Sequence, residues 1–358
     1  MRKVISIITA GVLCGVLLPA GLASCQPETC TLCNNVPEGL PSTLSLSLEP
    51  VTPTRSTLSQ SQEQDNTINT LDIFIFRKGD PASEEYHRLD TYQRFEGNSL
   101  SDITVSTTTG GKLICVIANS NIGDYTGITS LETFRAMTTL LKDETAGDFT
   151  MYGESEQTLG ITASVAISLS RLISRICVTS IKTDFSDSPY TGMRLSGCRL
   201  FLINVHGEKH VHNCSSPEEP LILNNGSLVG EDVNSTVEAG LLMDNIPDAI
   251  GDEGYSIPHY LYCYPNETDD ISSSTKLVLQ AELDGVTYYY PVPVNQEGYG
   301  LQSEGGISGI SRNSVYSYSI TITRPGSLDP DTPLVPGTLE LSLTVNGWDL
   351  IPHFDKVF

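Results

Sequence analysis

An alternation of leucine with polar residues is the first strong pattern in the chain. Leu44, Leu46 and Leu48 alternate with serine, which predicts a strand that buries one face. Residues 50–66 follow as a polar, proline-containing linker with open, solvated backbone. In this linker the bond between Arg55 and Ser56 is an accessible cleavage site for a trypsin-like protease. The pattern therefore predicts a first strand that a protease could separate from the rest of the chain.

The next segment, residues 71–76, is apolar at nearly every position. Such a run predicts a strand that is buried on both faces, as in the interior of a sandwich. Side chains alternate between the two faces of a strand. We therefore expect Ile73 and Ile75 to face one apolar layer and Phe74 and Phe76 to face another.

Strand patterns dominate the rest of the chain. Alternating or continuous apolar runs predict strands at residues 103–105, 113–118, 165–169, 176–178, 200–203, 277–279, 288–290, 315–322 and 339–345. One helix is predicted behind Thr129 and Ser130 as possible N-caps. The apolar residues that recur there with helical spacing are Leu131, Phe134, Met137 (or Ala136), Leu140 and Leu141. We predict an all-β chain of two sandwich-like units with one or two short helices, and a unit boundary near residues 169–185.

The N-terminus carries the pattern of a secretory signal. Arg2 and Lys3 precede an apolar stretch that ends near Ala20, and small residues then lead to Cys25. This order predicts a lipoprotein signal peptide, residues 1–24, with acylation of Cys25. The apolar run is short for a membrane-spanning helix and contains Pro19. We therefore expect an exported protein that acyl chains hold on a bacterial membrane.

Charge and cysteine content narrow the function classes. Acidic residues number 43 against 20 basic residues, so a nucleic-acid partner is excluded on charge. After loss of the signal and acylation of Cys25, seven of the nine cysteines remain, and an odd number cannot all pair. Cys115 and Cys177 lie in apolar runs and are predicted to be buried thiols. Cys30 and Cys33 lack the strand and helix setting of a redox motif.

Two clusters offer ligand chemistry, although each has a simpler interpretation. His210, His212 and Cys214, with His206 nearby, would share one strand face at a spacing that can bind zinc or copper, or they form a solvated polar hairpin. No further ligand is evident, so we predict neither a metal nor a cofactor.

Tyr260, Tyr262 and Tyr264 would share another strand face as a glycan-binding platform, or they are ordinary sheet residues. The chain contains no GxSxG, HExxH or phosphate-binding loop motif, so an enzyme is not predicted. A glycan-binding surface lipoprotein and a lipoprotein hydrolase remain as lower-ranked alternatives.

Several segments, in the same order along the chain, resemble the fimbrillins of the Bacteroidales, the subunits of type V pili. They are residues 71–76, 111–120, 151–154, 169–171 with 176–178, Arg312-Asn313 with Tyr316 and Tyr318, and 339–348. The lipoprotein signal and Arg55 agree with the same resemblance.

The resemblance implies a role in assembly without catalysis. Members of the family are exported lipoproteins with two transthyretin-like β-sandwich domains, and an arginine-specific surface protease removes their first strand. An extended segment from the C-terminal end of another subunit then fills the vacated groove by donor-strand exchange. On this basis Arg55 and Ser56 flank the maturation site, and Leu44, Leu46 and Leu48 belong to the removable strand.

The resemblance also implies a domain plan and partners. We expect a signal at 1–24, a propeptide with the removable strand at 25–55, and β-sandwich domains at 56–168 and 169–358. The expected partners are other pilin subunits, the outer membrane before cleavage, the surface protease, and a host or bacterial receptor. The cleavable arginine favours a stalk or tip subunit of an adhesive surface fimbria, while a pilus anchor subunit stays open.

Overall fold

The computed structural model describes residues 37–49, 67–97, 100, 103–224, 241–299, 306–334 and 338–348. In these ranges the chain is almost entirely β, with one short α-helix, α2 (Leu131–Arg135), and one 3-10 helix, η3 (Leu141–Asp143). No helix in the described part is long and apolar enough to span a membrane. The all-β class with short helices is therefore confirmed. Cys25, Arg55 and Ser56 lie outside the described residues.

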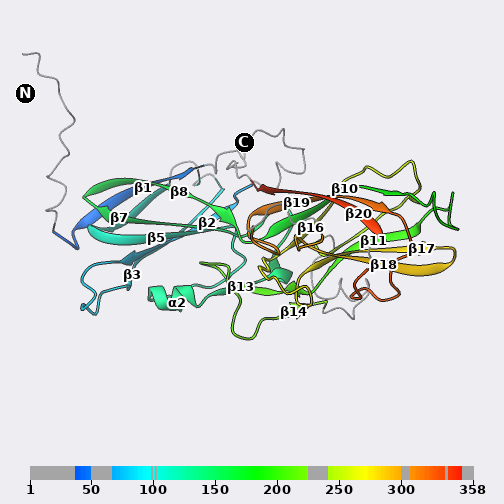
Figure 1. The fold of residues 1–358 in the computed structure, drawn as a ribbon. Coiled ribbons are helices and arrows are strands. Elements are labelled where there is room, and N and C mark those ends of the chain that lie inside the picture. The colour runs from blue at the N-terminus through cyan, green and yellow to red at the C-terminus, as the bar shows by residue number, and fades with distance from the viewer. Residues whose placement is uncertain are drawn as a thin grey trace, which may run out of the picture. The chain divides into compact units, whose positions relative to one another are not determined.

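Two sheets form the N-terminal sandwich (Figure 1). The smaller sheet has the strand order β4 (Ile103–Thr108), β1 (Pro41–Glu49), β8 (Thr162–Ser168). The larger sheet has the order β3 (Leu89–Glu96), β2 (Thr70–Arg77), β5 (Gly110–Ala118), β7 (Met151–Leu159), β9 (Ser170–Arg171). The first predicted strand thus lies in the middle of a sheet, between partners from later in the chain.

The apolar core of this sandwich follows the expected alternation along β2. Ile73 and Ile75 belong to the cluster that also contains Leu44 and Leu46 of β1. Phe74 and Phe76 point to the opposite side and pack in a second cluster, where both rings contact the ring of Phe134 in α2. The prediction that β2 is buried on both faces is confirmed.

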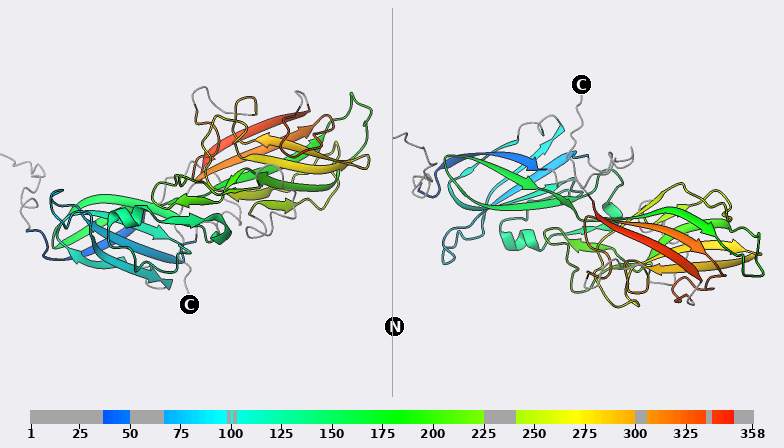
Figure 2. Two further views of the ribbon diagram at one scale, coloured as in Figure 1. Left: turned by 90° about the horizontal axis from the view of Figure 1, so that it is seen from below. Right: turned by 45° about the horizontal axis from the view of Figure 1, so that its top comes forward.

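Two further sheets form the C-terminal sandwich (Figure 2). One has the order β16 (His259–Cys263), β10 (Ser174–Thr183), β19 (Ser314–Ile322), β20 (Leu339–Gly347). The other has the order β15 (Met243–Asn245), β11 (Ser196–Ile203), β17 (Lys276–Leu283), β18 (Val286–Pro293).

The two sandwiches share one topology. Taken in chain order, β10, β11, β15, β16, β17, β18 and β19 occupy the positions of β1, β2, β3, β4, β5, β7 and β8. In each case the first strand pairs antiparallel with one neighbour and parallel with the other. The exceptions are β9 and β20, which extend one sheet of each sandwich beyond this common plan.

The helix in the structure is shorter than the segment over which apolar residues recur with helical spacing. Ser130 caps α2, accepting a hydrogen bond from the backbone of Thr133, but the helix ends at Arg135. The chain then forms β6 (Thr138–Leu140), which pairs with β13 (Glu208–His210). A distant strand therefore overrides the helical spacing of the apolar residues. A second short pair joins β12 (Val205–His206) to β14 (Ile222–Leu223).

Candidate functional site: the β1 groove

The first strand of the N-terminal sandwich has a neighbour on each side. Six residues of β1, from Pro41 to Leu46, pair antiparallel with β4, and seven, from Thr43 to Glu49, pair parallel with β8. We call the space between β4 and β8 the β1 groove. Because β4 and β8 each lie at an edge of this sheet, β1 supplies the ladder contact between them.

One face of β1 fills the interior of the sandwich. Leu44 is completely buried, Leu46 is 6% exposed and Leu48 is partly buried against the same apolar cluster. Burial of one leucine side chain contributes about 1.5–3 kcal/mol. The leucines of the predicted removable strand therefore share one buried face, while the serines between them face outward.

Ser42 is the small polar residue at the start of this inward face. It is buried, and its Oγ donates a hydrogen bond to the carbonyl oxygen of Gly160, 2.6 Å away. The same turn, between β7 and β8, accepts the backbone N–H of Thr43 at the carbonyl of Ile161. These contacts fix the register of β1 at its N-terminal end.

The residues before β1 continue this attachment. Gly39 N donates to Thr109 O, Thr109 N donates to Leu40 O, and Thr109 Oγ1 donates to Pro37 O. The side chain of Glu38 lies over Gly79 and Gly110, where an added Cβ would approach Glu38 atoms to 3.1 and 2.9 Å. A cavity of about 270 Å³ opens beside this segment.

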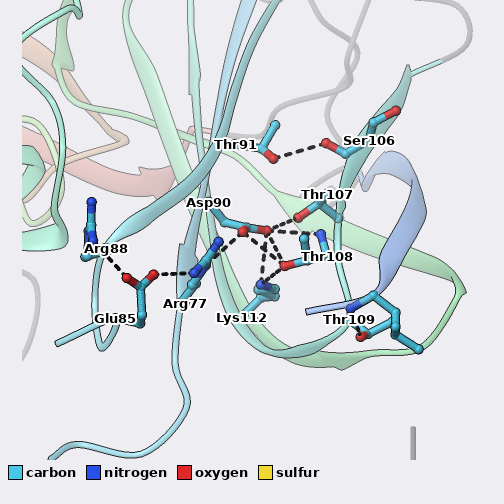
Figure 3. Close-up of polar contacts among 11 residues, drawn as sticks. Arg77, Glu85, Arg88, Asp90, Thr91, Ser106, Thr107, Thr108, Thr109 and Lys112 are labelled. Atoms are coloured by element: carbon cyan, nitrogen blue, oxygen red, sulfur yellow. Dashed lines mark hydrogen bonds and ion pairs between the residues drawn. The ribbon is translucent and has the colours of Figure 1, made fainter. Parts of the chain in front are cut away.

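A buried polar cluster holds β4 against the larger sheet (Figure 3). At its centre, the Asp90 carboxylate of β3 is 1% exposed, and Lys112 Nζ of β5 is 3.0 Å from it. The carboxylate also accepts hydrogen bonds from Thr107 Oγ1 at 2.6 Å, Thr108 N at 3.0 Å and Arg77 Nε at 2.9 Å. We call these five residues the Asp90 cluster.

The electrostatics of the Asp90 cluster keep its carboxylate ionised. Burial alone would raise the pKa of Asp90, but hydrogen bonds from Thr107, Lys112, Arg77 and Thr108 outweigh burial and hold this pKa well below its usual range. Next to the cluster, Thr91 Oγ1 of β3 donates to Ser106 O of β4. The Asp90 cluster thus connects β4 to β2, β3 and β5 without any atom of β1.

The predicted sites differ in where the structure places them. Leu44, Leu46 and Leu48 come together in the β1 groove, whereas Cys25, Arg55 and Ser56 are outside the described residues. Cys115 and Cys177 are buried free thiols, as predicted. Sequence reasoning missed Ser42 and the Asp90 cluster. A charged Lys112 inside an apolar strand run was the available signal, since such a residue needs a buried partner.

The histidine pattern does not form the expected strand face. The strand ends at His210, and residues 211–213 turn, so that Cys214 lies at φ 59° with its Sγ donating to Leu172 O. Over the described residues, no group of three His, Cys, Asp or Glu side chains is placed to hold a metal.

Of the two interpretations of the tyrosines, burial supports the one in which they are ordinary interior residues. Tyr262 is buried against Phe149 and Trp348, and Tyr264 is buried with its hydroxyl bonded to Glu144. Only Tyr260 of the three keeps partial exposure. These side chains stabilise the C-terminal part and do not form a surface for sugars.

A known protein family matches the part of the chain that forms the β1 groove. Residues 42–192 match the model of the family described as major fimbrial subunit protein (FimA). This range contains β1 from Ser42 onward and the later strands of the N-terminal sandwich. The resemblance to fimbrillins is confirmed. No curated protein sequence gives a significant match.

Solved structures show the same fold over most of the fimbrillin-like chain. A fimbrilin of Porphyromonas gingivalis has a TM-score of 0.61 at 18% identity, covering 87% of this chain and 98% of that one. Proteins named for cell adhesion from Parabacteroides distasonis and Bacteroides eggerthii each have a TM-score of 0.64, at 17% and 19% identity. Both alignments cover 88% of this chain and 98% of the other. At these identities the likeness establishes the β-sandwich fold.

Proposed function

We propose that this chain is a structural stalk or tip subunit of an adhesive surface fimbria, assembled by strand exchange after proteolysis. In this proposal the precursor is exported, acylated at Cys25 and held on the outer membrane. An arginine-specific protease cuts between Arg55 and Ser56, β1 leaves, and an extended segment from the C-terminal end of another subunit fills the β1 groove. The role is structural and not enzymatic.

The position and attachment of β1 carry the proposal. Its contacts with the sandwich are two backbone ladders, three leucines and the Ser42 hydroxyl. An incoming strand with the same alternation can satisfy the ladders and the apolar pockets alike. An empty groove would expose unpaired edges of β4 and β8, so it favours the binding of another strand.

The Asp90 cluster supports the same reading. It anchors β4 to the larger sheet by side chains that do not depend on β1. One wall of the groove therefore stays attached when β1 departs. Such a preformed wall lowers the ordering cost for an incoming strand.

Cleavage in vitro tests the proposal directly. Wild-type protein, Arg55→Ala and the matched control Arg88→Ala, an exposed arginine elsewhere in the N-terminal sandwich, are treated with trypsin and sized on unboiled denaturing gels. We expect heat-resistant multimers from wild type and Arg88→Ala, and monomers from Arg55→Ala. Equal yields from Arg55→Ala, or no multimers from wild type, would contradict the proposal.

Membrane attachment has its own test. Cys25→Ala is expected to abolish acyl labelling and to leave the signal peptide uncleaved at the lipoprotein site, because the variant lacks the acceptor thiol. Acyl labelling at the wild-type level would reject Cys25 as the lipid site. Lipidated Cys25 on the only surface form of the wild type would favour an anchor subunit instead.

A further inference from the structure

Two distant segments of the chain carry closely similar sequences. Residues 41–49 read PSTLSLSLE and residues 336–344 read PGTLELSLT. Six of the nine aligned positions are identical: Pro41 and Pro336, Thr43 and Thr338, Leu44 and Leu339, Leu46 and Leu341, Ser47 and Ser342, Leu48 and Leu343. The first segment is β1, and the second contains the start of β20.

The shared topology of the two sandwiches does not account for this similarity. The strand at the position of β1 in the C-terminal sandwich is β10, whose sequence SRICVTSIKT lacks the leucine alternation. In turn, β20 has no counterpart in the described sheet of the N-terminal sandwich that contains β8. The similarity therefore links two strands that occupy different positions in the fold.

Among the described strands, β20 has one neighbour where β1 has two. It pairs with β19 through nine residues, from Leu339 to Gly347. Leu343 is buried, but Leu339, Leu341 and Val345 are only partly buried against the core. In the β1 groove a strand with this pattern would pair with both β4 and β8 and would be more deeply buried.

We propose that β20 of a second copy of this chain is the strand that enters the β1 groove, in the direction and register of β1. This inference rests on the strand exchange of the proposed function and identifies its partner. Leu339, Leu341 and Leu343 take the places of Leu44, Leu46 and Leu48. Like β1, the donated strand runs parallel to β8 and antiparallel to β4.

The positions that differ between the two sequences support this register. Ser42, buried against Gly160, aligns with Gly337, so a small residue is kept where β1 approaches that turn most closely. Ser45 is exposed on β1, and its aligned residue Glu340 is exposed on β20. A register shifted by two residues toward the C-terminus would instead bring a leucine to the position of Ser42.

The far end of β20 is locked before donation. Trp348 is 3% exposed, its N–H donates to Asn313 O at 2.7 Å, and its carbonyl accepts a hydrogen bond from Arg171 Nη1 at 3.1 Å. The guanidinium of Arg171 also lies 4.4 Å from the centre of the Trp348 ring. Release of β20 must break these contacts, which keeps the strand in place until a groove is available.

Peptide binding to the nicked full-length protein tests the donor. Three labelled peptides are compared: residues 336–347, residues 349–358, and residues 336–347 with Leu341→Asp. Unlabelled wild-type protein is cut by trypsin after Arg55, and a peptide of residues 41–49 is the positive control. We expect residues 336–347 to displace β1, and the Leu341→Asp peptide to bind about 100-fold more weakly, because it buries an unpaired carboxylate.

Other results of the peptide comparison would reject β20 as the donor strand or reject strand exchange itself. If residues 41–49 bind but residues 336–347 do not, or if residues 349–358 bind in their place, β20 is not the donor. If even residues 41–49 fail to enter the nicked protein, the groove does not exchange strands. That result would reject the proposed function together with the inference.

A disulfide trap tests the register in assembled protein. Ser47 pairs with Ala166 of β8, and Ala166 is exposed, so Ser342→Cys on one copy should cross-link to Ala166→Cys on another. The control pairs Ser342→Cys with Ser164→Cys, two residues along β8. Multimers that cross-link at position 164 as readily as at 166 would overturn the proposed register.

Discussion

The two sandwiches fill the same topological position with strands of different character. In the N-terminal sandwich, β1 is held by backbone ladders, a row of leucines and one hydroxyl. In the C-terminal sandwich, β10 presents Ile176 and Val178 to the core and adds contacts that depend on particular residues. The guanidinium of Arg175 lies 4.7 Å from the Trp348 ring centre, and Thr179 Oγ1 donates to Tyr318 O.

In the proposed strand exchange, this difference favours β1 over β10 as the strand that is replaced. Ladders and leucine pockets are generic, so another alternating strand can satisfy them. The contacts of Arg175 and Thr179 are specific to β10 and would be lost with any substitute. Under the proposed function, the same topological position therefore holds a replaceable strand in the N-terminal sandwich and a permanent strand in the C-terminal sandwich.

The largest expected effect separates these two strands. Ile176→Asp in β10 places an unpaired carboxylate in the core, and we expect a loss of about 5 kcal/mol in the free energy of unfolding, enough to prevent folding. Leu44→Asp in β1 should release β1 and leave the remaining strands folded. Hydrogen exchange of β5 and β17 in both variants measures the contrast. Global unfolding of Leu44→Asp would show that β1 is as necessary for folding as β10.

Removal of the Asp90 charge should weaken the groove wall. Asp90→Asn leaves Lys112 buried without its counter-charge, at a cost of about 3–5 kcal/mol in stability. The matched control is Asp72→Asn, a buried carboxylate of β2 that bonds Tyr92 and Arg94 without contacting β4. Hydrogen exchange should quicken at β4 amides in Asp90→Asn only. Equal exchange in both variants would mean that the Asp90 cluster does not anchor β4.

The stability of the protein should depend on pH through Glu144, whose carboxylate accepts a hydrogen bond from the Tyr264 hydroxyl. Burial raises the pKa of this carboxyl to about 7, against hydrogen bonds from Thr150 and Tyr264 that lower it. The pKa of Glu144 in the folded protein therefore lies above its unfolded value of 4.5. The protonated carboxyl contributes its full stability below pH 4.5, and this contribution is lost as the pH rises toward 7. The free energy of unfolding should fall by up to about 3 kcal/mol over this range.

Urea unfolding between pH 4.5 and 8 measures the contribution of Glu144. Glu144→Gln should remove most of this slope, while the exposed control Glu132→Gln should keep it. An unchanged slope in Glu144→Gln would assign the pH dependence to other groups.

The smallest expected effect concerns the hydroxyl of Ser42. Ser42→Ala loses its hydrogen bond to Gly160, which should weaken β1 attachment by about 1 kcal/mol and raise the population of released β1 about fivefold. Hydrogen exchange of β1 amides reports this change, and the exposed Ser47→Ala is the control. Identical protection in the two variants would show that the leucines and ladders alone hold β1.

Much of the fold was predictable because its signals are local. The alternation at Leu44, Leu46 and Leu48 and the two apolar faces of β2 both follow from a period of two. The sequence could not show which strands pair with one another. Nothing near Leu44 indicates that β1 lies between β4 and β8, or that its pairing with β8 is parallel.

The wrong predictions have the same cause. Met137 and Leu140 continue a helical spacing, but pairing of β6 with β13 ends the helix at Arg135. His210 and Cys214 alternate as in a strand, yet a turn follows His210. For the candidate site, the leucines were visible in the sequence, whereas the Asp90 cluster joins four strands and appears only when they are folded together.

The paired neighbours of β1 have a mechanical consequence. A strand with a ladder on each side, pulled along its own axis, bears the load in shear, so that many hydrogen bonds must yield together. A strand that is paired on one side, as β20 is with β19 among the described residues, gives way one bond at a time when it is peeled sideways. A subunit junction built on the β1 groove would therefore resist tension along the fibre far better than β20 resists removal from its sheet, and its lifetime under flow would be set by the rate of forced unfolding.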